Sequence, residues 1–209
     1  MSRPTPTYEE CYALVLLREY LHMTNLKLSD RPDIVYDNKS GIEVVSALFE
    51  EDKRLETILM RKKENKKTDH LPPGYTQCPY FIMHPLKSSQ DCGATNKYER
   101  CTSEAIELIK RTIDKKKEKV DSYNKANNFK TDRLFVFTRL FIDGDALKVV
   151  GRDMYHRASD TFTNLYLLVE DVNCLIVCNS HGIFLNFFTD EEQYQYACQA
   201  QNIQRRIEE

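Results

Sequence analysis

Two carboxylates inside apolar stretches are the residues of this 209-residue chain whose types and spacing could do chemistry. Asp33 precedes the β-branched and aromatic residues 34–36, and Glu43 lies within the apolar residues 42–45. Residues 38–41, Asn-Lys-Ser-Gly, predict a tight turn, so we expect the two carboxylates to lie side by side on a hairpin. A half-buried carboxylate is costly unless it is paired or binds a cation. The pair therefore predicts a hard divalent ion with oxygen ligands, Mg²⁺ or Mn²⁺. The alternative is an ordinary hairpin in which Asp33 caps a turn and Glu43 pairs with a lysine.

The order Pro32-Asp33, hairpin, Gly41-Ile42-Glu43-Val44-Val45 resembles the core of the PD-(D/E)xK nuclease superfamily. The resemblance implies that Asp33 and Glu43 hold the metal and that the carbonyl of Val44 adds a ligand. The lysine of that motif, which positions or activates the attacking water, is replaced here by Val45. The resemblance covers roughly residues 8–170. It implies an α/β fold with a restriction-endonuclease-like α-β-β-β-α-β core and a mixed sheet, extended by C-terminal strands and a helix.

A helix expected over residues 103–127 offers a replacement for the missing lysine. Its buried stripe consists of isoleucines and a valine: Ile106, Ile109, Ile113 and Val120. Lys116 and Lys117 lie about 50° either side of the centre of that stripe, and Lys119 is nearby. We expect Lys116 to reach toward the sheet and supply the catalytic amine, as in relatives of this fold whose motif lysine has moved to a helix. The alternative is that this basic run is simply a solvated face.

The first predicted helix, over residues 8–23 with Thr7 as its N-cap, adds one more candidate. Glu10 falls about 40° from Leu14 on the apolar stripe of this helix. The resemblance implies that a glutamate from this helix joins the site. The alternative is that Glu10 is a first-turn acid that interacts favourably with the helix dipole.

The other elements follow from hydrophobic periodicity and turn signals, and their order predicts a single α/β domain over residues 1–209. We expect helices over residues 48–67, 146–158 and 190–207, and strands over residues 80–83, 134–142, 165–170, 174–179 and 183–188. We also expect a basic helix end at residues 61–67 and an irregular insertion over residues 68–102.

Composition excludes several classes of protein. A formal net charge of −2 excludes a uniformly basic nucleic-acid binder. The seven cysteines show no C-x-x-C pair, so we expect free thiols in a reducing cytoplasm rather than zinc ligands. Zinc could otherwise draw on insertion residues: Cys78, Cys92, Cys101, His70 and His84. No apolar run approaches the roughly 20 residues that span a bilayer, and we expect no membrane partner.

Three functions remain open. The first is a magnesium-dependent deoxyribonuclease with Asp33, Glu43, Lys116, Lys119 and Glu10 in its site. The second is a nuclease-like fold that has lost catalysis and serves as a binding or assembly module, which Val45 favours. The third is a zinc-stabilised interaction protein built on the insertion. DNA is the partner implied by the first function, and the oligomeric state stays open.

Overall fold

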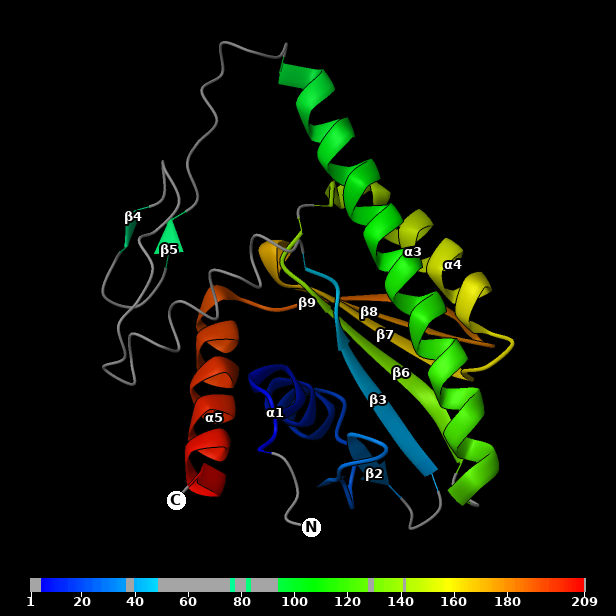
Figure 1. The fold of residues 1–209 in the computed structure, drawn as a ribbon. Coiled ribbons are helices and arrows are strands. Elements are labelled where there is room, and N and C mark those ends of the chain that lie inside the picture. The colour runs from blue at the N-terminus through cyan, green and yellow to red at the C-terminus, as the bar shows by residue number, and fades with distance from the viewer. Residues whose placement is uncertain are drawn as a thin grey trace. The chain divides into compact units, whose positions relative to one another are not determined.

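The computed structural model describes residues 5–36, 40–48, 76–77, 82–83, 94–127, 130–140 and 142–208. The chain divides into two compact units, one formed by residues 1–47 and 101–209 and the other by residues 48–100. The first unit is a seven-stranded mixed sheet with helices on both faces (Figure 1), which confirms the expected α/β class. No helix in these ranges has the length and apolar character that crossing a bilayer requires.

The N-terminal part of the first unit begins with two helical segments and three strands. These are α1 (Tyr8–Val15), the π-helical turn η1 (Leu16–Tyr20), β1 (Lys27–Leu28), β2 (Ile34–Tyr36) and β3 (Ser40–Ser46). Thr7 is the N-cap of α1, as predicted, because its hydroxyl accepts a hydrogen bond from the Glu10 N–H. The α-helical geometry ends at Val15 rather than near residue 23, since the next turn is π-helical.

Helix α3 (Ala94–Asn127) crosses the boundary between the two units and is followed by the rest of the first unit. The following elements are β6 (Lys130–Thr138), η2 (Gly144–Ala146), α4 (Leu147–Ala158), β7 (Asn164–Val169), η3 (Glu170–Val172), β8 (Cys174–Asn179), β9 (Gly182–Phe187) and α5 (Asp190–Glu208). The helix expected over residues 146–158, the three C-terminal strands and the closing helix are therefore confirmed within one or two residues.

The second unit contains a small antiparallel pair, β4 (Thr76–Gln77) and β5 (Ile82–Met83). Strand β5 overlaps the strand expected over residues 80–83. The helix expected over residues 48–67 and most of the insertion at 68–102 lie outside the described residues. Residues 94–102, expected within that insertion, are helical because α3 begins at Ala94.

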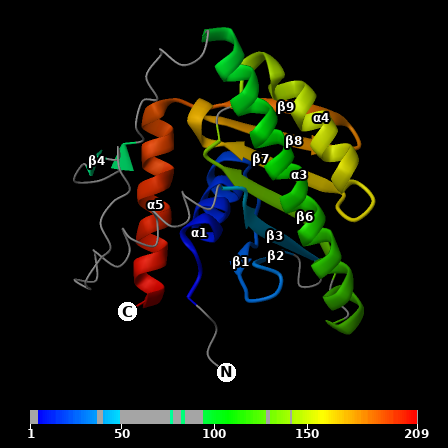
Figure 2. The same cartoon turned by 45° about the horizontal axis from the view of Figure 1, so that its top comes forward.

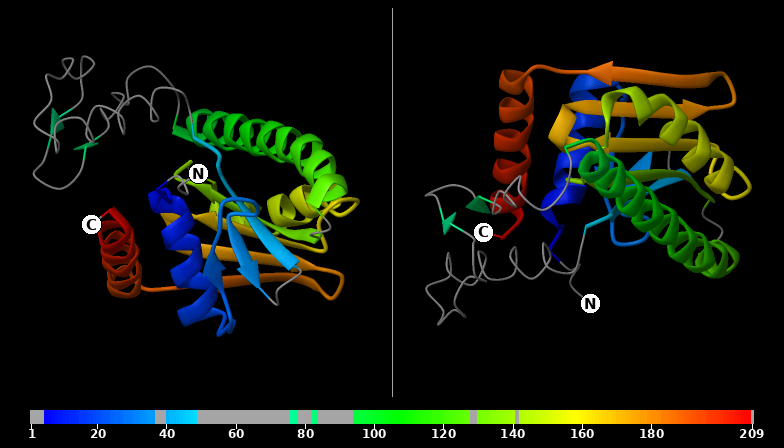
Figure 3. Two further views of the ribbon diagram at one scale, coloured as in Figure 1. Left: turned by 60° about the horizontal axis from the view of Figure 1, so that its bottom comes forward. Right: turned by 90° about the horizontal axis from the view of Figure 1, so that it is seen from above.

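Seven strands of the first unit pair in the order β1-β2-β3-β6-β7-β8-β9. The first three strands are antiparallel, β3, β6 and β7 are parallel, and β7, β8 and β9 are again antiparallel. Helices α1 and α5 pack on one face of the sheet, whereas α3 and α4 pack on the other (Figure 3). Because side chains alternate along a strand, each strand residue can be assigned to one of these faces.

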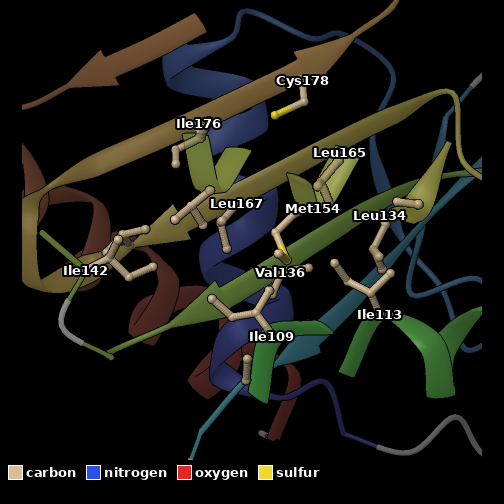
Figure 4. Packing of buried hydrophobic residues seen from close by; sticks show 14 of the residues in the cluster. Ile109, Ile113, Leu134, Val136, Ile142, Met154, Leu165, Leu167, Ile176 and Cys178 are labelled. Carbon is tan, nitrogen blue, oxygen red and sulfur yellow. The ribbon is translucent and has the colours of Figure 1, made fainter. Parts of the chain in front are cut away.

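The core beneath α3 and α4 is built from aliphatic side chains of facing elements (Figure 4). Leu134 and Val136 of β6 point into it, while Phe135 and Phe137 of the same strand pack against α1. A strand that is buried on both faces has a continuous run of apolar residues, and for this reason the sequence predicts a buried strand here. Ile113 of α3 is fully buried in this core and holds its helix on the sheet.

The sequence places the central strand at residues 134–142, but β6 covers Lys130–Thr138. Its polar start is tied to α3, because the Asn124 side chain accepts a hydrogen bond from Thr131 N and donates one to the Thr131 carbonyl, at 3.1 and 3.4 Å. After Thr138 the chain leaves the sheet, and exposed Arg139 pairs with Glu170 at 2.7 Å. Tertiary contacts therefore override the apolar pattern at both ends of this strand.

Gly151 lets α4 lie close to the sheet. A Cβ added there would lie 2.7 Å from Cγ2 of Ile176 and 3.1 Å from Cγ2 of Ile183. We therefore expect Gly151→Ala to lower the free energy of unfolding by about 1–3 kcal/mol, as overpacking usually does, although alanine is the better helix former. Urea unfolding measures this change. The control is Val149→Ala at an exposed position of the same helix, which should be neutral or slightly stabilising; a stabilised Gly151→Ala would contradict the close packing.

Candidate active site

The register of the hairpin brings Asp33 and Glu43 together. Ile34 pairs with Ile42 in the antiparallel β2–β3 ladder, so the next pair along is Asp33 opposite Glu43. Both isoleucines belong to the core beneath α1. Since side chains alternate, Asp33 and Glu43 project from the opposite face, toward α3. The expected proximity of the two carboxylates is confirmed.

Both carboxyl groups are largely removed from water. Glu43 is 2% exposed and is the only charged residue in the described part of the chain that is fully buried. Asp33 Oδ2 accepts a hydrogen bond of 2.7 Å from the Val44 N–H. Burial, followed by the charge of Glu43, raises the pKa of Asp33 to about 8, and Lys116 and the Val44 N–H only partly oppose this rise. Near neutral pH, therefore, either Asp33 is protonated or a cation in addition to Lys116 must balance its charge.

Lys116 of α3 lies at the carboxylate pair. Its Nζ is 2.5 Å from Glu43 Oε2 and 3.7 Å from Asp33 Oδ2, and its side chain is only 19% exposed. The position expected for this lysine is therefore confirmed, while its catalytic role stays a prediction. Val45, which replaces the motif lysine, projects from the same face as Glu43 and packs against the core beneath α3.

The neighbours of Lys116 anchor α3 to the end of α4. Lys117 Nζ donates to the Arg157 carbonyl and to Asp160, both at 2.7 Å. Arg157 donates two hydrogen bonds, of 2.8 and 2.5 Å, to the two carboxylate oxygens of Asp114. At least this part of the basic run is therefore not simply a solvated face. Sequence reasoning missed Arg157 and Asp160, because no periodicity links them to residues some 40 positions away.

The other predicted site residues have different positions. Lys119 is exposed, one turn beyond Lys116 on α3. The Glu10 carboxylate accepts a hydrogen bond from the Thr7 N–H in the capping box of α1. Because α1 packs on the face opposite α3, the structure does not bring Glu10 to the carboxylate pair, and its first-turn capping role is the better interpretation.

The groups around Glu43 fit a small oxygen-binding cation. In a strand the N–H and C=O of one residue point to the same side, so the carbonyl of Val44 faces the side on which its N–H meets Asp33. Asp33, Glu43 and this carbonyl are oxygen donors of the kind Mg²⁺ and Mn²⁺ prefer. Within the described ranges no cluster of three or more His, Cys, Asp or Glu side chains is arranged for a metal, so the carbonyl and water would have to complete the set.

The zinc alternative rests on residues whose side chains are not described: Cys78, Cys92, Cys101, His70 and His84. Among the described residues, Cys11, Cys174, Cys178 and Cys198 take part in no disulfide bond. Comparison of the chain with protein-family models, with curated proteins and with solved structures finds no match.

The raised pKa of Asp33 predicts a pH dependence of stability in metal-free protein. The folded state keeps a proton on Asp33 up to about pH 8, whereas an unfolded chain loses it near the ordinary aspartate pKa of 3.8. Folding is therefore favoured at low pH, and this contribution is lost as the pH rises from about 4 to about 8, by up to roughly 1 kcal/mol per pH unit. Asp33→Asn, which mimics the protonated acid, should remove this slope in chemical unfolding with a chelator present. Parallel pH profiles for the two proteins would contradict the raised pKa.

Proposed function

We propose that this protein is a metal-dependent nuclease of the PD-(D/E)xK kind that hydrolyses phosphodiester bonds in DNA. The observation that carries the proposal is the position of the Lys116 amine, 2.5 Å from Glu43 and 3.7 Å from Asp33. Val45 cannot orient water or stabilise charge, so an active site of this kind needs a cation from another element. Lys116 is such a cation, and it lies on α3, the helix on which the sequence analysis predicts it.

The order of elements supports the same family. Apart from β4 and β5, which belong to the second unit, helix α1, strands β1, β2 and β3, helix α3 and strand β6 come in this order along the chain, with β6 parallel to β3. This is the α-β-β-β-α-β order that the resemblance implies, and β7, β8, β9 and α5 extend it. Fold order alone does not define an activity, and so the proposal depends on the site.

Asp33, Glu43 and the Val44 carbonyl would hold Mg²⁺ or Mn²⁺. When bound, such an ion lowers the pKa of a coordinated water and neutralises charge on the scissile phosphate. Its arrival would replace the proton that the carboxylate pair otherwise retains on Asp33. Metal affinity is therefore expected to rise with pH through the pKa of about 8.

The side chains of the chain itself have separate roles in this proposal. Glu43 holds the Lys116 amine through the ion pair, and the Val44 N–H fixes one oxygen of Asp33. The Lys116 amine can then donate hydrogen bonds to the attacking water or to a phosphate oxygen whose charge increases in the transition state. Lys119, exposed one turn away, is suited to a weaker electrostatic contribution.

A nuclease-like fold without catalysis, serving as a binding or assembly module, is the second candidate. The observation in its favour is the same ion pair, because Lys116 already compensates the buried Glu43 charge without a metal. A buried carboxylate that is fully compensated by an amine needs no further cation. The two candidates differ in whether added metal produces cleavage.

DNA cleavage by the wild type and by Lys116→Met separates these candidates. The wild type should cut plasmid or single-stranded DNA when Mg²⁺ or Mn²⁺ is added. Lys116→Met should cut roughly 10²- to 10⁴-fold more slowly, the usual contribution of a side chain that transfers or orients a proton. Initial rates on both substrates measure the effect. Lys115→Met is the matched control, because Lys115 is the preceding residue of the same helix and is exposed.

Equal rates for the wild type and Lys116→Met would remove Lys116 from catalysis. A wild type that is inert on both substrates with both metals would replace the nuclease with the binding or assembly module. Lys119→Met should lower the rate less than Lys116→Met does, since its exposed amine is screened by water.

A further inference from the structure

Strand β1 forms the edge of the sheet next to the candidate site (Figure 2). Leu28 of β1 packs into the core beneath α1. Its neighbours Lys27 and Ser29 therefore project from the opposite face, the one on which Asp33, Glu43 and Lys116 meet. Strand β1 could not be predicted from the sequence, because two residues are too few to show an alternating apolar pattern.

The register of β1 places these residues beside Asp33. Lys27 pairs with Val35 and Leu28 with Ile34, and the Ser29 N–H donates to the Asp33 carbonyl at 2.7 Å, which continues the same ladder. Ser29 is thus the cross-strand neighbour of Asp33. Lys27 is the diagonal neighbour, roughly 7–8 Å away between α-carbons, within reach of a long side chain.

Exposure increases from β3 to β1 across this face. Glu43 on β3 is 2% exposed, Asp33 beside β2 is partly exposed, and Lys27 on β1 is exposed. Among these three residues, the one at the β1 edge is the most accessible to a substrate. Two carboxylates repel a phosphodiester backbone, and a cation at their rim offsets that repulsion.

We propose that Lys27 binds a backbone phosphate of the DNA that flanks the scissile one, so that the substrate crosses the β1 edge. This inference rests on the proposed nuclease function and adds the direction from which the substrate approaches. Lys27 contacts substrate but takes no part in bond cleavage. Its loss should weaken binding and raise KM by severalfold, with little change in kcat.

The test measures how DNA binding depends on salt in a background that cannot cleave, Glu43→Gln. Fluorescence anisotropy with labelled single-stranded and duplex oligonucleotides gives the affinity between about 50 and about 200 mM salt. One lost phosphate contact lowers the slope of log K against log salt by about 0.7 for single strands and about 0.9 for duplex DNA. We expect Lys27→Ala to show this change. Lys148→Ala, an exposed lysine on α4 next to β8 and β9 at the other edge of the sheet, should leave the slope unchanged.

Circular dichroism checks that both variants remain folded, which their exposed positions favour. An unchanged slope for Lys27→Ala, in a protein whose wild type cleaves DNA, overturns the assignment of Lys27 and leaves the nuclease proposal intact. An equal change for Lys148→Ala also overturns it, because the effect would then be one of net charge. A wild type that neither binds nor cleaves either DNA overturns both proposals.

Discussion

Two buried carboxylates cannot both stay ionised side by side in this sheet unless positive charge compensates each of them, and Lys116 compensates one, Glu43. The other features of the site depend on this constraint. The hairpin register fixes Asp33 opposite Glu43, and the buried face of α3 brings the amine to them. Without the amine, the pair would need a second proton or a metal ion. The same constraint explains why the pKa of Asp33 stays high even with Lys116 present, since burial and Glu43 outweigh a single amine.

The position of Lys116 depends on how α3 is held over the sheet. Isoleucines on the buried stripe set which side of the helix faces the core, and successive residues differ by about 100° in direction. Asp114 and Lys117, on either side of Lys116, are tied to Arg157 and Asp160 at the end of α4. Such exposed pairs add little stability by themselves, but they fix the rotation of the helix. The lysine run thus combines one residue in the site with another that anchors the helix.

The sequence predicts the parts of the site that depend on local pattern. The apolar runs and the turn predict the hairpin, and the helical stripe predicts that Lys116 faces the sheet. The polar start of β6 was missed because it depends on Asn124, a contact between two elements. The family resemblance predicts Glu10 in the site. In the structure Glu10 instead forms the capping box of α1 with Thr7, and α1 packs on the face of the sheet opposite the site. The β1 edge was missed because only pairing to β2 reveals it.

The proposed function requires Asp33 and Glu43 to bind a divalent metal ion beside the Lys116 amine. Isothermal titration with Mn²⁺ tests it most directly, in wild type, Asp33→Ala and the control Asp153→Ala, an exposed acid on α4. Asp33→Ala should weaken Mn²⁺ binding by more than about 100-fold, while Asp153→Ala should bind Mn²⁺ as the wild type does. Equal affinity of the wild type and Asp33→Ala for Mn²⁺ would contradict it.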